Sequence, residues 1–260
     1  MWLSDFFFPS IGVLLTNILW LAPFPKVQYS LRYRDLGTLN PVPYILMIFN
    51  CFGLVIYGCL KADHFIFWGE VFGMFLSIYY SVSSLLLCTL SVEHEDKHLN
   101  NTCCFLFTNF TMWSAICYYA SSIDREKSVY AIGLSSCVWT VAYYGAPLSS
   151  TITILTLKNS SSIDINLVAM NFVCSTSWFI YAYMSINDTF IMIPNFIGCC
   201  LAATQFVLWT AYRGAENVTQ KDNRAIDDSI QSFVVGLIWG FPIESGVYQK
   251  FSLCRLRAEA

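Results

Sequence analysis

The apolar stretch FIFWGEVFGMFLSIYY, residues 65–80, contains one charged residue, Glu70. An ionised carboxylate is costly inside hydrocarbon, so an acid there usually faces a cavity, binds a partner or carries a proton. Three hypotheses follow: Glu70 accepts hydrogen bonds from a polar substrate, or it loads and releases a proton, or it is hydrated near the surface. The third stays open because Glu70 lies only about 7.5 Å along a helix from Phe65.

The composition indicates a membrane protein that is entirely helical. Of the 260 residues, 56% are hydrophobic and only 12% are charged, where soluble domains carry about a quarter charged residues. A membrane-spanning helix needs about 20 apolar residues. Seven segments reach this length, namely 6–25, 41–60, 65–90, 103–122, 129–156, 165–186 and 189–212.

The positive charges in the loops predict the orientation of these seven helices. Eight Lys and Arg residues lie on the side of the first, third and fifth loops and the start of the C-terminal tail, and three lie on the other side. Positively charged loops stay in the cytosol. We therefore expect the N-terminus outside and the C-terminus in the cytosol, in the plasma membrane rather than an internal membrane.

The sequence contains no pattern typical of an enzyme or a metal site. Most of the eleven cysteines lie inside the predicted spans, where they act as small apolar residues, and none forms a CxxC pair. A glycine-rich phosphate loop and a hydrolase triad are both missing. We expect no catalytic residue, no metal, no cofactor and no nucleic-acid partner.

The two halves of the chain share a pattern of residues. Pro23 in the first span recurs as Pro147 in the fifth, and Glu70 in the third span recurs as Asn195 in the seventh. Equivalent positions are four spans apart, so two three-helix repeats run in the same direction around a fourth helix. We expect a first repeat over 1–90, a linker with the fourth helix over 91–128, a second repeat over 129–212, and a cytosolic, partly amphipathic tail over 213–260. Two parallel repeats that enclose a pathway are typical of a transporter.

Several motifs resemble those of the SWEET, or MtN3/saliva, sugar transporter family. They are LAPFPKV, NPVPYILMIFNCFGLVIYG, YYGAPLSS, SWFIYAYM and FIMIPNFIGCCLAATQFVLW, and the resemblance covers about residues 10 to 212. It implies a 3+1+3 helix bundle that moves mono- or disaccharides down their gradient by alternating access, as a uniporter without ATP. It also implies a sugar substrate, contact with membrane lipid and assembly into homo-oligomers.

The resemblance assigns four positions to the sugar pocket. Trp178 and Asn195 match the family, and they supply an aromatic face for the sugar C–H groups and an amide for its hydroxyls. Glu70 replaces the second asparagine, and Leu54 replaces a small polar residue. Because Leu54 fills space, we expect a monosaccharide before a disaccharide.

The family also places a proline in each of the first two helices of each repeat, where the helices bend. Pro23, Pro43 and Pro147 match this set, and the fourth position is Asp164. A proline inside a helix removes a hydrogen bond and so provides a bend point. Asp164 has two interpretations, a gating residue or the N-cap of the sixth span.

Two other functions remain as alternatives to a sugar uniporter. One is a proton-coupled carrier of another small polar solute that uses Glu70, as in the PQ-loop relatives. The other is a binding protein without transport activity, similar to the KDEL receptor, although such a receptor needs basic residues in its cavity and no predicted span contains Lys or Arg.

Overall fold

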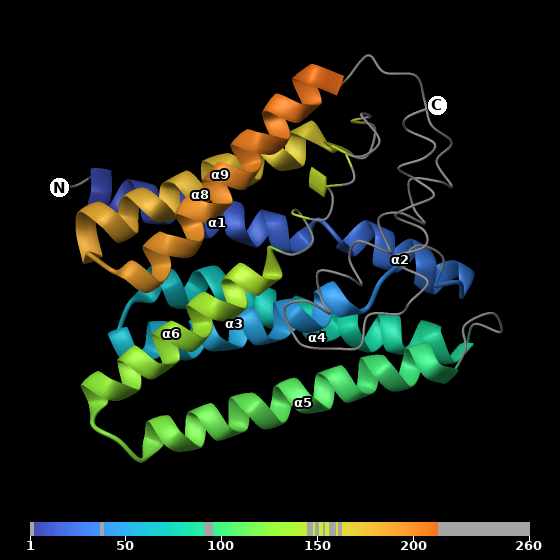
Figure 1. Ribbon diagram of the computed structural model, residues 1–260, viewed down its shortest axis with the longest axis horizontal. Coiled ribbons are helices and arrows are strands. Elements are labelled where there is room, and N and C mark those ends of the chain that lie inside the picture. The colour runs from blue at the N-terminus through green and yellow to red at the C-terminus, as the bar shows by residue number, and fades with distance from the viewer. Residues whose placement is uncertain are drawn as a thin grey trace. The chain divides into compact units, whose positions relative to one another are not determined.

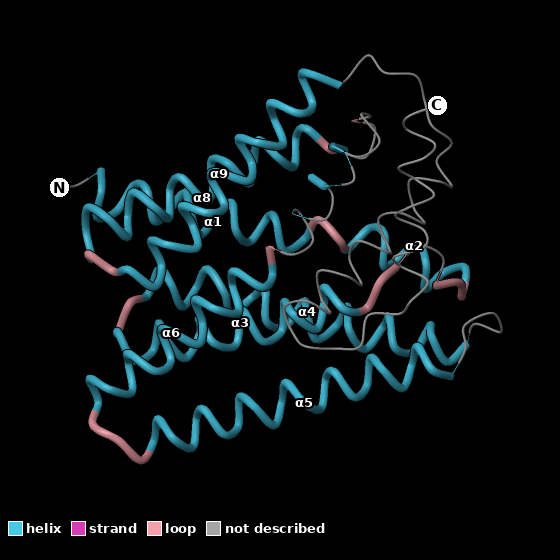
Figure 2. The backbone as a smooth tube through the Cα atoms, in the orientation of Figure 1, coloured by secondary structure: helices cyan, strands magenta, loops and turns pink. Residues whose placement is uncertain are grey.

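The computed structural model of the chain describes residues 3–36, 39–90, 96–144, 148, 151–152, 154–155, 160 and 163–212, with side chains for all of these except 96–98 and 101. Within these residues every regular element is a helix (Figures 1 and 2). The elements, with η marking a π-helical turn, are η1 Leu3–Phe7, α1 Phe8–Leu21, α2 Phe24–Tyr33, α3 Val42–Lys61, α4 His64–Leu90, α5 Asp96–Ser121, α6 Arg125–Tyr143, α8 Ile165–Tyr181, η2 Ala182–Ile186 and α9 Thr189–Tyr212.

Five helical segments in the described part of the chain are long and apolar enough to cross a membrane. They are Leu3–Tyr33, Val42–Lys61, His64–Leu90, Ile165–Ile186 and Thr189–Tyr212, and they correspond to five predicted spans. Helix α5 covers the fourth predicted span but begins at Asp96 rather than 103, because the helical backbone continues into the polar sequence DKHLNNT. Its 26 residues rise about 39 Å, enough to cross the bilayer.

The first span is broken near the end of its predicted range 6–25, at one of the predicted bend points. Helix α1 ends at Leu21, and Pro23 is the N-cap of α2. The helix breaks here because proline has no backbone N–H with which to donate the next hydrogen bond of α1.

Two other predicted bend positions, Pro43 and Asp164, lie at the starts of helices and do not break one. Pro43 is the second residue of α3, where its missing N–H breaks no intrahelical bond. Asp164 precedes α8, and its Oδ1 accepts hydrogen bonds from the backbone N–H groups of Asn166 and Leu167 at 3.0 and 3.3 Å. This confirms the N-cap hypothesis for Asp164. Pro147 and the tail over 213–260 lie outside the described residues.

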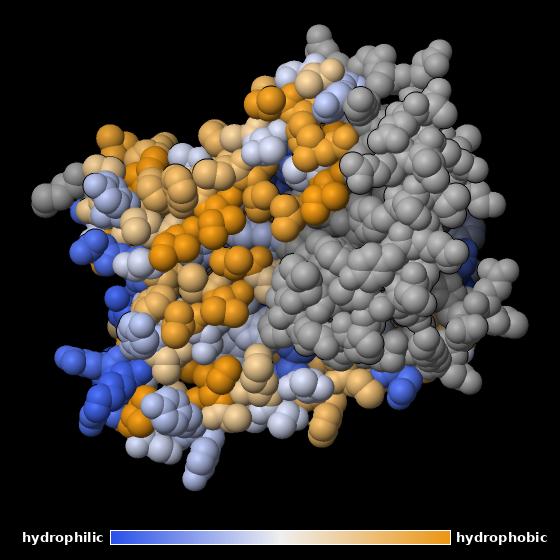
Figure 3. All heavy atoms as spheres, in the orientation of Figure 1, coloured by the Kyte–Doolittle hydropathy of each residue, from blue (hydrophilic) through white to orange (hydrophobic). Residues whose placement is uncertain are grey.

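The described helices present many apolar side chains on their outer surfaces. On α4, exposed large residues recur at helical spacing, namely Trp68, Phe72, Phe75, Ile78, Val82 and Leu86. Apolar side chains also cover much of the described surface visible in Figure 3. Such faces suit contact with lipid.

The chain divides into two compact units, which we describe separately. The first unit comprises Met1–Tyr143 and Ser177–Pro194, and the second comprises Tyr144–Thr176 and Asn195–Ala260. In the second unit, α8 and α9 approach closely at Gly198, where an added Cβ would lie 2.7 Å from both Ser175 Oγ and Tyr144 Oη. Small residues allow this kind of approach between membrane helices.

Candidate functional site

Trp178, near the end of α8, is held between two glycines of the first unit. An added Cβ at Gly69 of α4 would lie 2.9 Å from its ring, and one at Gly12 of α1 would lie 3.0 Å away. The indole Nε1 donates a hydrogen bond to Thr16 Oγ1 at 2.9 Å, and only 6% of Trp178 is exposed. The second predicted repeat therefore inserts a large ring against α1 and α4 of the first.

Glu70 follows Gly69 on α4 and is buried, with 8% of the residue exposed. Its carboxyl group shares a hydrogen bond with the thiol of Cys51 on α3. The carboxyl oxygen Oε2 is buried and has no hydrogen-bond partner among the residues that the structure describes. Of the three hypotheses for Glu70, hydration near the surface agrees least with this burial.

The other two predicted pocket residues lie in different units. Leu54 is buried on α3 in the first unit, one helical turn after Cys51. Asn195 belongs to the second unit, where it is half-buried and directly follows Pro194 inside α9. The first unit thus contains Trp178, Glu70 and Leu54, with Trp178 packed on the residue that precedes Glu70.

Two tyrosine–aspartate hydrogen bonds connect the repeats within the first unit. The Tyr57 hydroxyl donates to Asp188 Oδ2 at 2.6 Å, and the Tyr181 hydroxyl donates to Asp63 Oδ2 at 2.7 Å. Tyr57 and Asp63 come from the first repeat, and Tyr181 and Asp188 occupy the equivalent places in the second. Each tyrosine therefore binds the aspartate of the other repeat, and we call these two bonds the crossed pairs.

Both aspartates of the crossed pairs also cap the start of a helix, and this holds their side chains in place. Asp63 Oδ1 accepts hydrogen bonds from the N–H groups of Phe65 and Ile66, which caps α4. Asp188 Oδ1 accepts a bond from Phe190 N at 3.0 Å, which caps α9. Capping uses one carboxylate oxygen and leaves the other for the tyrosine. The helix starts thus hold the crossed pairs in position.

The crossed pairs are chemically unequal. Lys61 Nζ lies 3.3 Å from Asp188 Oδ2, and Asp188 is 4% exposed. Asp63 has no such cation among the described residues. The pair that contains Asp188 is therefore reinforced by a charge, and the pair that contains Asp63 is not.

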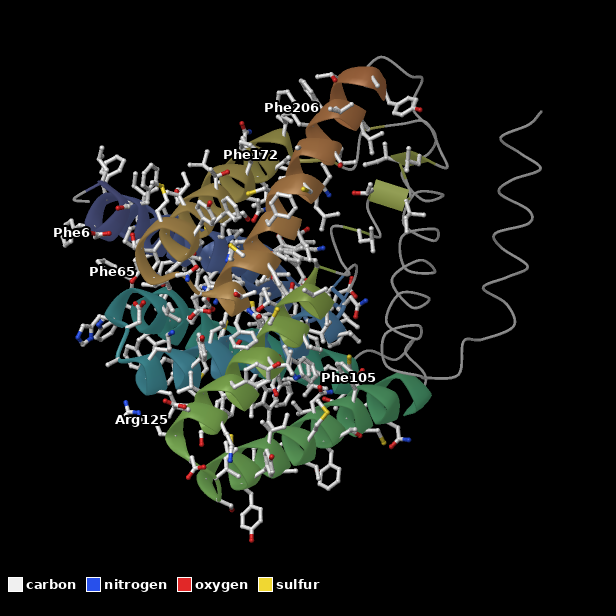
Figure 4. The ribbon with its side chains drawn as sticks, turned by 60° about the vertical axis from the view of Figure 1, so that its left-hand side comes forward. Phe6, Phe65, Phe105, Arg125, Phe172 and Phe206 are labelled. Atoms are coloured by element: carbon white, nitrogen blue, oxygen red, sulfur yellow. The ribbon has the colours of Figure 1, made fainter. Side chains whose placement is uncertain are left out.

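Aromatic rings surround the Tyr181 pair. The Phe65 ring meets Tyr181 edge-on with centroids 5.7 Å apart, and Phe6 of η1 meets Phe65 in the same way at 5.9 Å. Figure 4 shows Phe6 and Phe65 side by side at one end of the helices. The Tyr181 ring is thus connected through Phe65 of α4 to Phe6 of η1.

The crossed pairs were missed by the sequence analysis, although a signal for them was present. Asp63 and Asp188 lie in short loops outside the predicted spans, where an acid is unremarkable. They are nevertheless related by the same offset of about 125 residues that relates Glu70 to Asn195. Extending the repeat comparison into the loops would have found them.

Comparisons with known proteins give a consistent result. A family described as sugar efflux transporters for intercellular exchange (MtN3/saliva) matches residues 6–91 and 130–217. "Sugar transporter SWEET1" of Drosophila pseudoobscura pseudoobscura is 27% identical over 203 residues, which cover 77% of this chain and 86% of that protein. "Bidirectional sugar transporter SWEET7" of Arabidopsis thaliana is 25% identical, with 78% of each protein covered.

A solved structure matches the described fold. It is the 3.7 Å structure of a eukaryotic SWEET transporter, with a TM-score of 0.72 and 19% identity, and the match covers 81% of this chain and 97% of that one. At this identity the match establishes the fold. It confirms the predicted all-α membrane architecture, with seven transmembrane helices arranged as 3+1+3.

Proposed function

This chain belongs to the MtN3/saliva family, the SWEET transporters, and we propose that it carries small sugars across a membrane. Membership of a transporter family confirms the expectation that the chain is not an enzyme. We further propose that monosaccharides are preferred to disaccharides, and that sugars move down their gradient as each repeat alternately opens the pathway to one side.

The crossed pairs are the observation that carries this proposal. They join the two repeats by two short hydrogen bonds at the ends of α3 and α8, and both tyrosines are at least 95% buried. A transporter that alternates between two openings needs contacts that form in one state and break in the other. The crossed pairs provide such contacts, and their formation would close this end of the pathway.

The distribution of Lys and Arg in the loops favours placing the crossed pairs at the extracellular end of the pathway. The predicted orientation places the loops with Asp63 and Asp188 outside the cell and the C-terminus in the cytosol. The described state would then be closed to the outside. We propose the plasma membrane as the site, with repeats over 1–90 and 129–212 joined through 91–128.

We propose that the sugar binds near Trp178, Glu70, Leu54 and Asn195. Trp178 offers an aromatic face, Glu70 an acceptor for hydroxyl groups, and Leu54 an apolar wall. The free Oε2 of Glu70 supports this role, because a sugar hydroxyl would complete its hydrogen bonding. Bending at Pro23, Pro43, Pro147 and Asp164 would accompany the alternation of the repeats.

Uptake of labelled glucose, fructose and sucrose into proteoliposomes tests the proposal. We expect glucose or fructose to equilibrate faster than sucrose, and net flux to reverse when the sugar gradient is reversed. Absence of uptake for every sugar would refute it. Accumulation above the outside concentration would instead favour the alternative of a proton-coupled carrier, for which the buried acid Glu70 is the supporting observation.

A further inference from the structure

Sugar binding does not explain why residue 70 is a glutamate, because an amide side chain at this position could also form hydrogen bonds with a sugar. Glu70 is 8% exposed, and its Oε2 is buried without a hydrogen-bond partner. Its one side-chain partner is the Cys51 thiol, which is a weak hydrogen-bond donor. A buried carboxylate normally has a cation or several strong donors beside it. Glu70 has neither among the described residues.

The helices around Glu70 offer no counter-charge. Helix α1 contains no titratable residue, and α3 presents only the fully buried Cys51 to the acid. Lys61, at the end of α3, is paired with Asp188. His64, on α4 itself, is exposed and lies about 9 Å before Glu70 along the helix.

The remaining contacts of α4 are also uncharged near Glu70. Helix α2 meets α4 at Tyr79, whose hydroxyl accepts a hydrogen bond from Gln28, about 13 Å further along the helix. Helix α5 meets it near Cys88, about 27 Å further along. From α8, Trp178 packs on Gly69, and Tyr181 is bonded to Asp63. Within the part of the chain that the structure describes, the charged form of Glu70 therefore has nothing that compensates its burial.

The acid is connected to the opposite repeat through a buried polar chain. The side chain of Cys51 also interacts with Asn50, which is 2% exposed. Asn50 Oδ1 accepts a hydrogen bond from Thr140 Oγ1 of α6 at 2.7 Å. The chain runs from α4 through α3 to α6, the first helix of the second repeat. Any movement between these helices changes the surroundings of the carboxyl group.

We propose that Glu70 is a proton-binding site, and that a proton on it stabilises the conformation in which the crossed pairs are formed. The proposal rests on the sugar-transport function above. When this conformation opens, water or sugar reaches the carboxyl group and the charged form becomes tolerable, so the proton is released. Proton binding and conformation are then linked, and pH alters the rate of transport.

Sugar exchange at equal concentrations on both sides of a proteoliposome tests this linkage. The variant Glu70→Gln keeps the size and the acceptor oxygen but cannot release a proton. From about pH 5 to about pH 8, we expect exchange by the unaltered protein to change about threefold or more, and exchange by Glu70→Gln to stay constant. Glu126→Gln, at an exposed position on α6, is the matched control and should keep the profile of the unaltered protein.

Thermal unfolding of the purified protein provides a second readout that requires no transport. If the buried site favours the neutral acid, raising the pH above about 4 should lower the melting temperature of the unaltered protein relative to Glu70→Gln. Below about pH 4 this pH-dependent difference should vanish, because a glutamate in the unfolded chain then keeps its proton as well. Coincident exchange profiles, or coincident melting profiles, for the two proteins would overturn the proposal. Failure of both proteins to exchange sugar would refute the transport function, and the melting profiles would still decide whether Glu70 binds a proton.

Discussion

Trp178 shows how single residues define the candidate pocket. Its ring fits because positions 12 and 69 have no side chain, and its orientation is fixed by the hydrogen bond to Thr16. A ring with a fixed orientation is what the proposed stacking against a sugar requires.

We predict that Trp178→Phe lowers sugar uptake several-fold. Phenylalanine retains an aromatic ring but loses the N–H donor, which costs about 1 kcal/mol and frees the ring to reorient. Uptake by proteoliposomes is the measurement, and Trp68→Phe, at a position that is 59% exposed, is the matched control. Equal uptake by both variants would show that the indole of Trp178 has no special role.

A prediction follows from the difference between the crossed pairs, namely that Lys61 is paired with Asp188 but not with Asp63. Tyr181→Phe leaves Asp63 Oδ2 without its tyrosine, whereas Tyr57→Phe leaves Asp188 still paired with Lys61. Both changes should destabilise the closed end, and Tyr181→Phe should have the larger effect. We expect faster modification of introduced cysteines along the pathway by a membrane-impermeant thiol reagent, applied from outside.

The control for this experiment is Tyr118→Phe, because Tyr118 is 76% exposed on α5. Its reagent accessibility should equal that of the unaltered protein. If Tyr57→Phe opened the pathway more than Tyr181→Phe, the contribution assigned to Lys61 would be wrong.

At the scale of elements, the break between α1 and α2 is the clearest departure from straight helices. It separates α1, which carries Thr16 and Gly12 against Trp178, from α2, which packs on the later part of α4. A joint at Pro23 would let these two pieces move separately.

We predict that Pro23→Ala slows sugar uptake more than Pro43→Ala does. Alanine at 23 restores an N–H and favours a continuous helix through the break, whereas Pro43 lies in the first turn of α3, where proline already fits. Initial uptake rates, normalised to protein in the membrane, give the comparison. A larger effect at Pro43 would place the moving joint in α3 instead.

The sequence predicted the positions of the helices well, but it predicted the side-chain contacts between them only in part. Long apolar runs bounded four spans to within one residue, because the cost of exposing backbone groups in lipid allows few alternatives to a helix. The helices of the first and fourth spans extend seven or more residues beyond the predicted limits, into polar sequence. Glu70 was recognised for the same reason, as a costly charge. Its contact with Cys51, and the fit of Trp178 between Gly12 and Gly69, depend on how helices rotate against one another, which hydrophobicity does not encode.

At the scale of the whole molecule, the first compact unit contains parts of both repeats. Residues Ser177–Pro194 of the second repeat belong with Met1–Tyr143, and the crossed pairs and the Trp178 contacts lie within this unit. The repeats are therefore joined at this end of α8 and α9 by specific side-chain bonds, consistent with a closed state.

The last prediction concerns the direction in which the molecule faces. Eight Lys and Arg residues on one side against three on the other should retain that side in the cytosol. An epitope tag at the N-terminus should then be reached by antibody in intact cells, and a tag at the C-terminus only after permeabilisation. An introduced cysteine in place of exposed His64, beside Asp63, should likewise react with an impermeant reagent from outside. If His64→Cys reacted only from the cytosolic side, the crossed pairs would close the inner end of the pathway, and the described state would be closed to the cytosol.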